Sequence, residues 1–166
     1  MTDLCPPKEL AKWFINRVER NVGESITHLK LQKLLYFAQA YHLANFDEPL
    51  FAEEMQAWTH GPVVPSVWHD YKDYSWQSIP TTEDEASVPE NLTPYLEAIY
   101  VHFGKFDAKE LERITHSHDP WRLTRNGLRP EQAFSDPIEK NIIREFYGKR
   151  IEAKRKKKSS VRTRGR

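Results

Sequence analysis

The segment from Leu34 to Leu43 most restricts how this chain can fold, because apolar residues occupy almost every position around a helix there. A helix without a polar face is usually surrounded by the protein core. Thr27 suits the N-cap of this helix, and the apolar pattern reaches about Asn45. We therefore expect one central helix. Three of its side chains should be nearly fully buried: Leu34, Leu35 and Ala38.

Shorter apolar stripes at helical spacing predict further helices around the central one. They are expected at about residues 8–19, 65–71, 93–103, 107–114 and 135–148, with a short one starting at Asp119. A minor β element is expected within residues 49–58, before a Gly-Pro turn at residues 60–65. The sequence therefore predicts a mainly α, single compact domain of six or seven helices, spanning residues 1–148.

Charge is distributed unevenly along the chain. Residues 149–166 hold ten Lys or Arg and one Glu, a formal charge of +9, which leaves −8 on residues 1–148. The basic segment has almost nothing to bury, so we expect a disordered tail. Such a tail attracts nucleic acid without sequence selectivity, because it lacks aromatic groups for stacking. The residues expected to contact phosphates are Lys154, Arg155, Lys156, Lys157 and Lys158. A tail that only aids solubility is the alternative.

Compartment and membrane association follow from the cysteine content and from hydropathy. A single cysteine, Cys5, excludes an internal disulfide and fits a reducing compartment. The first residues lack the basic start and apolar run of a signal peptide, and the longest apolar stretch is shorter than a membrane span of about 20 residues. We expect a cytoplasmic protein without membrane contact.

Catalytic and metal-binding patterns are weak. His116, His118 and Asp119 lie close in sequence, but His ligands on a helix prefer i, i+4 spacing, and Asp119 suits the N-cap before Pro120. Cys5 precedes two prolines, and Ser66 lacks the glycine-flanked turn of a serine nucleophile. The sequence therefore predicts no enzyme, no metal and no cofactor.

Aromatic residues are concentrated near the Gly-Pro turn. Trp and Tyr are favoured at protein interfaces as well as in cores, so packing and recognition remain alternatives here. The candidate partner-binding residues are Trp58, His60, Trp68, Tyr71 and Trp76.

Several motifs together resemble one family. The segment Leu29–Gln39, with Leu31, Gln32, Lys33, Leu34 and Leu35, is similar to the signature helix of the Panacea domain family of SocA-like antitoxins. Ala57-Trp58, Gly61-Pro62-Val63-Val64-Pro65 and Val67-Trp68 follow in the family order, and then His116, Pro120 and Trp121. The resemblance covers about residues 6–147. It does not include the basic tail, and His60 stands where many members have Tyr.

This resemblance implies a phage-associated antitoxin of a toxin–antitoxin system. Its partner would be a cognate protein toxin, neutralised by direct binding, either through masking or through delivery to a AAA+ protease. The acidic body would complement a basic toxin surface. The alternative is a nucleic-acid-binding regulator acting through the basic tail.

Overall fold

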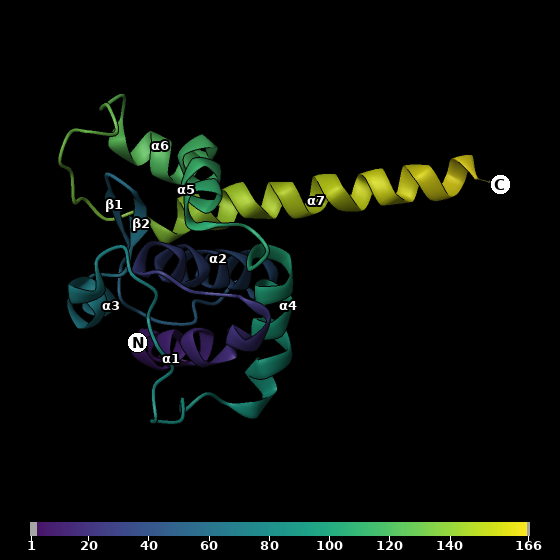
Figure 1. The fold of residues 1–166 in the computed structure, drawn as a ribbon. Coiled ribbons are helices and arrows are strands. Elements are labelled where there is room, and N and C mark those ends of the chain that lie inside the picture. Colours follow the sequence, from purple (N-terminus) through teal and green to yellow (C-terminus); the bar gives the residue numbers. More distant parts are fainter. Residues whose placement is uncertain (1–2, 166) are drawn as a thin grey trace.

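The computed structural model describes residues 3–165, and its centre is helix α2, His28–Phe46. Thr27 caps the helix, since its Oγ1 accepts a hydrogen bond from the Lys30 amide at 3.3 Å. Figure 1 shows α2 in the middle of the body with other helices on several sides. Leu34, Leu35 and Ala38 are fully buried. The central-helix prediction is therefore confirmed.

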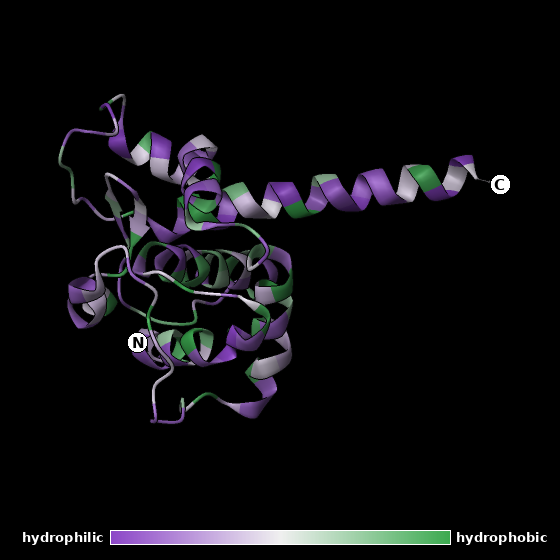
Figure 2. Ribbon diagram, in the orientation of Figure 1, coloured by the Kyte–Doolittle hydropathy of each residue, from purple (hydrophilic) through white to green (hydrophobic). Residues whose placement is uncertain are grey.

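Helices and short turns pack around α2 on several sides. Within residues 3–165 the α-helices, besides α2, are α1 (Pro7–Arg17), α3 (Pro65–Tyr71), α4 (Thr93–Phe103), α5 (Ala108–Ser117), α6 (Asp119–Arg125) and α7 (Lys140–Arg164). Three 3-10 turns join them, η1 (Arg20–Val22), η2 (Lys72–Tyr74) and η3 (Glu90–Leu92). Figure 2 shows the hydrophobic residues gathered on α2 and on the faces turned toward it. The prediction of a mainly α domain is confirmed.

The β element is a hairpin that lies over one end of α2. Strands β1 (Gln56–Trp58) and β2 (Gly61–Val63) pair antiparallel, with Ala57 opposite Pro62. A later segment runs beside β1, where the Ala57 amide donates to Asp136 O at 3.0 Å. Ile138 N likewise donates to Met55 O at 2.7 Å. The hairpin is therefore held by a segment about eighty residues further along the chain.

Two predicted helix starts differ from the structure. His118 is the N-cap of α6, and Asp119 is its first residue, with a carboxylate that pairs with Arg122 at 2.5 Å. His118 is buried instead, with its Nδ1 2.9 Å from Tyr147 Oη. Helix α7 begins at Lys140 rather than at Ser135, because residues 136–138 are used in pairing beside β1.

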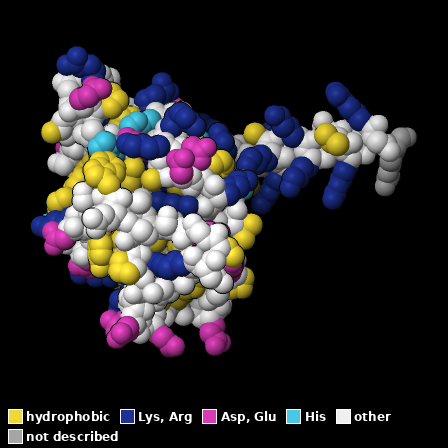
Figure 3. Space-filling view, viewed as in Figure 1, with side chains coloured by type: hydrophobic (Ala, Val, Ile, Leu, Met, Phe, Trp, Pro, Cys, Tyr) yellow, Lys and Arg dark blue, Asp and Glu magenta, His cyan; other side chains and the backbone are white. Residues whose placement is uncertain are grey.

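The prediction of a disordered tail is wrong. Helix α7 continues through Gly148 to Arg164, so no break separates residues 1–148 from the basic segment. Its first part packs on α2 and buries Ile143 and Tyr147. Figures 1 and 3 show the rest projecting from the body, with Lys and Arg side chains along it. We call residues 149–164 the basic arm. Because the packed half nucleates the helix, Lys, Arg and Ala propagate it readily.

No helix within residues 3–165 is long and apolar enough to span a membrane.

Candidate functional site: an aromatic pocket beside the hairpin

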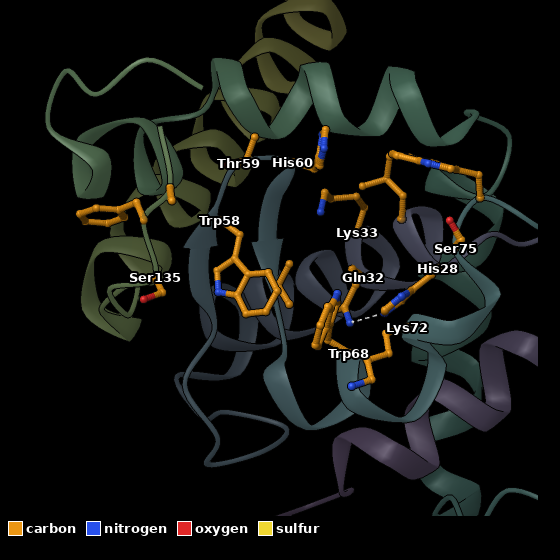
Figure 4. A pocket seen from close by; sticks show the side chains of 15 residues that line it. His28, Gln32, Lys33, Trp58, Thr59, His60, Trp68, Lys72, Ser75 and Ser135 are labelled. Carbon is orange, nitrogen blue, oxygen red and sulfur yellow. Dashed lines mark hydrogen bonds between the residues drawn. The ribbon is translucent and has the colours of Figure 1, made fainter. Parts of the chain in front are cut away.

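A pocket of about 570 Å³ opens between α2, the hairpin, α3 and the segment before α7. Figure 4 shows Trp58 and Trp68 on one side, His60 opposite them, and Gln32 and Lys33 reaching from α2. Trp76 and Phe134 also contribute to the lining. We call it the aromatic pocket. Its volume lies in the range of about 300–1,000 Å³ that is usual for small-molecule sites.

Two tryptophans form one wall of the aromatic pocket. The Trp58 and Trp68 rings meet edge to face, with centroids 5.3 Å apart. Trp58 is fixed by its Nε1–H, which donates to Gln56 Oε1 at 2.6 Å. The Lys72 amine lies 5.4 Å from the centroid of the Trp68 ring, a cation–π distance. An exposed lysine therefore stands at this aromatic wall.

On the other side of the pocket, His60 and Trp76 form a second aromatic pair. Their ring centroids are 5.8 Å apart, and Trp76 is 63% exposed. His60 Nδ1 lies 2.9 Å from Glu112 Oε1, and the Lys109 amine lies over the Trp76 ring. Residues of α5 thus hold His60 and Trp76, which form the rim of the pocket, while the Trp76 ring stays accessible to a partner.

Lys33 joins α2 to the hairpin. Its Nζ donates to Pro62 O at 3.0 Å, and the side chain is fully buried. Gly61 has φ +104°, and a methyl group added there would lie 2.6 Å from Lys33 Cε and 2.8 Å from Thr115 Oγ1. Only glycine allows both this backbone conformation and this close approach. The Gly-Pro motif therefore allows β2 to pack directly against Lys33.

Gln32 holds the residue that follows β2. Its Oε1 accepts from Val64 N at 2.8 Å, while its Nε2 is 3.4 Å from Val64 O and 3.1 Å from His28 Nε2. Burial lowers the pKa of His28 to about 4, so the ring is neutral at pH 7. The signature residues of α2 thus position the hairpin and do not present themselves to solvent.

Helix α6 holds the hairpin from its opposite side. Trp121 Nε1–H donates to Trp58 O at 2.7 Å, and His116 stacks on Trp121 with centroids 3.9 Å apart. Arg125 is buried and donates to Ala57 O at 2.9 Å and to Gln132 O at 2.5 Å. Pro120 occupies the first turn of α6, where its missing N–H costs nothing. The later motif therefore also supports the pocket wall.

The structure brings together four of the five expected partner-binding residues. Trp58, His60, Trp68 and Trp76 all line the aromatic pocket. Tyr71 lies outside the lining and packs against Tyr74 and His28. Lys72 and Phe134 were not expected at the site, because no local pattern marks them and only tertiary packing brings them to the pocket lining.

The side chains considered for catalysis are separated or engaged. Ser66 Oγ donates to Glu53 Oε1 at 2.5 Å. Burial raises the pKa of the Cys5 thiol to about 12, which disfavours the reactive thiolate. Among residues 3–165, no three His, Cys, Asp or Glu side chains gather as a metal ion would require.

The residues expected to contact phosphates all lie on the basic arm. Lys154, Arg155, Lys156, Lys157 and Lys158 are consecutive in α7, and all five are exposed. None of these five residues lines the aromatic pocket. The chain therefore carries two separate candidate surfaces, one aromatic and one cationic.

Comparison with known proteins identifies the family. The family described as "Antitoxin SocA-like, Panacea domain" matches residues 31–122, which include most of α2, the hairpin, α3, α4, α5 and the start of α6. Antitoxin SocA of Caulobacter vibrioides is 27% identical over 115 residues, and the alignment spans 61% of each chain. No solved structure matches. The matched region contains every signature residue that supports the aromatic pocket, from Gln32 to Trp121, and the chain belongs to the SocA-like Panacea domain family.

Proposed function

We propose that this protein is an antitoxin that neutralises a cognate protein toxin by binding it directly. Membership in a family of SocA-like antitoxins carries the proposal. An antitoxin that acts by binding needs a stable recognition surface and no catalytic group. The aromatic pocket and its rim supply such a surface, because large aromatic side chains dominate the binding energy of many protein interfaces.

The contact surface of this antitoxin is centred on Trp58, Trp68, Trp76 and His60. Trp76 is the most exposed of the three tryptophans, so a toxin would bury it on binding. The signature residues Gln32, Lys33 and Trp121 act indirectly, since they hold the hairpin that presents Trp58 and His60. Truncating a central aromatic anchor of an interface typically costs about 2 kcal/mol or more of binding free energy.

Rescue of growth tests this function. The open reading frame beside the gene for this chain is expressed from an inducible promoter, with and without the chain, and colony formation is counted. We expect the neighbour alone to stop growth and the pair to grow. Growth arrest that the chain does not relieve would contradict the proposal, as would a neighbour that is harmless.

A matched pair of variants locates the contact surface. Trp76→Ala should weaken rescue, whereas Phe46→Ala should not, because Phe46 is similarly exposed, at 58%, but lies at the opposite end of α2 from the pocket. Both changes remove an exposed aromatic ring, so neither should alter folding much. Repeating the assay in a strain without its AAA+ proteases separates masking from delivery, since only delivery requires the protease.

Nucleic-acid binding through the basic arm is a second candidate function. The observation that favours it is the helical arm itself, whose basic side chains are exposed over residues 149–164. Arg150, Lys154, Lys158 and Arg162 recur at i, i+4, so they follow one face of the helix. Like charges at this spacing repel one another, and a phosphate backbone would relieve that repulsion.

Salt dependence tests the second candidate. Binding of a short DNA duplex should weaken by about 0.9 log units per tenfold rise in salt for each phosphate contacted. A chain ending at Gly148 should lose this binding and still rescue growth. Equal binding by the full and shortened chains would exclude the arm as the cause.

A further inference from the structure

The aromatic pocket has the features of a ligand site that toxin binding alone does not require. Three tryptophans and Phe134 contribute to its lining. Trp58 and Trp68 form a wall on one side, and Trp76 stands beside His60 on the other. Facing aromatic surfaces of this kind favour a flat ring, which stacks or meets them edge to face.

The charges around the aromatic pocket favour an anion. Two lysines, Lys33 and Lys72, contribute to the lining, and no Asp or Glu within residues 3–165 does so. This contrasts with the formal charge of −8 on residues 1–148. Glu112, which contacts the lining residue His60, is already engaged by His60 and Lys109.

Lys33 supports this argument because, among residues 3–165, its buried amine forms no ion pair, and only the more distant carboxylate of Glu112 partly compensates its charge. Its amine donates one hydrogen bond, to Pro62 O, and it forms no ion pair with any side chain in the described part of the chain. A buried cation without a partner is destabilising unless another charge compensates it. Figure 4 shows the Lys33 nitrogen directed toward the space between Trp58 and His60.

From these observations we propose that the aromatic pocket binds a small aromatic anion, a planar ring that carries one carboxylate or phosphate group. The ring lies among Trp58, Trp68 and Trp76. The anionic group lies near the exposed Lys72 amine, and its charge also compensates that of the buried Lys33. A volume of about 570 Å³ accommodates a ligand of this class.

Probes that share a ring and differ in charge test the proposal on the purified chain alone. Indole-3-acetate, indole and tryptamine carry a negative, a neutral and a positive group, and AMP with adenosine forms a second pair for phosphate. The five tryptophans provide the readout, as side-chain Nε1–H signals in NMR spectra of ¹⁵N-labelled protein. Trp13 does not line the pocket and serves as the internal control.

We expect at least one anion to bind about tenfold more tightly than the ring of the same pair without a negative group, as a charge-assisted hydrogen bond implies. The shifted signals should belong to Trp58, Trp68 and Trp76. Preference for indole-3-acetate assigns a carboxylate ligand, and preference for AMP assigns a phosphate. Equal affinities within both pairs, no binding of either anion, or a shift confined to Trp13 would overturn the proposal.

Two matched lysine variants identify the source of the preference. Lys72→Gln should weaken binding of the preferred anion several-fold and leave neutral indole unaffected. Lys105→Gln removes an exposed lysine that does not line the pocket and should change neither. If the two variants behave alike, net charge and not the pocket attracts the anion, and the proposal is wrong. Because no toxin takes part, this result and the rescue assay succeed or fail separately.

Discussion

Lys33 holds an ionisable amine in the core, and burial lowers its pKa to about 7. In an unfolded chain a lysine titrates near 10.4. Between these two values the unfolded state binds more protons than the native state, so stability rises with pH across this interval. Below pH 7 both states are protonated, and the full cost of burying the charge is present.

Lys33→Met should therefore stabilise the protein at pH 7, since it removes the buried charge and keeps most of the volume. The lost hydrogen bond to Pro62 offsets about 1 kcal/mol of this gain. The difference in unfolding free energy between the variant and the original protein should shrink by up to about 1.4 kcal/mol per pH unit above pH 7. Urea unfolding of both proteins at pH 7 and pH 8.5 measures it. Parallel pH profiles would mean that Lys33 is not the titrating group.

Gly61→Ala should destabilise the hairpin. The positive φ alone costs an alanine of order 1–3 kcal/mol, and contact with Lys33 Cε and Thr115 Oγ1 adds to this. Gly148→Ala is the control, because Gly148 lies within α7 with no atom in the way and alanine is the better helix former by about 1 kcal/mol. Thermal unfolding should move in opposite directions for the two variants. A harmless Gly61→Ala would show that β2 does not depend on this approach to Lys33.

At the scale of single elements, α2 shows how much a local pattern can predict. Its apolar residues on every face indicated a buried helix, and Leu34, Leu35 and Ala38 are indeed fully buried. The helical basic arm could not be predicted from its apolar content, because its residues have almost nothing to bury. A helix also forms where a packed neighbour has already nucleated it.

Leu35→Ala should lower the free energy of unfolding by about 2–5 kcal/mol, the usual cost of emptying a core position. Val101→Ala is the control, since Val101 is 67% exposed on α4 and its loss should cost no more than about 0.5 kcal/mol. Urea denaturation followed by circular dichroism gives both values. A small effect at Leu35 would mean that the neighbouring helices collapse into the space.

At the scale of the whole molecule, the acidic body and the basic arm are joined by one continuous helix. The buried anchors of α7 are Ile143 and Tyr147, and Tyr147 Oη lies 3.1 Å from Tyr36 Oη on α2. Beyond Gly148 the arm is largely exposed. The arm thus contributes little to the core, although the helix that carries it is part of the core.

A chain ending at Gly148 should therefore fold with nearly unchanged stability. A chain ending at Ile142 loses both anchors and should be destabilised by several kcal/mol, as for large buried side chains generally. Chemical denaturation of the two shortened chains and the full chain compares them directly. If removal of residues 149–166 alone unfolds the body, the arm has a structural role that its exposure does not reveal.

The central helix, the charge segregation and the family could all be predicted, because each follows from residue types and their order along the chain and needs no long-range contact. The aromatic pocket, in contrast, was established by the tertiary structure alone. Its lining comes from α2, the hairpin, α3, the segment after η2 and residues 133–135, which long-range packing brings together. The tertiary structure also shows what the signature residues do. Gln32, Lys33, Gly61 and Trp121 meet at the hairpin because each satisfies a buried backbone group or fills a space that another element leaves, a relation that no local pattern records.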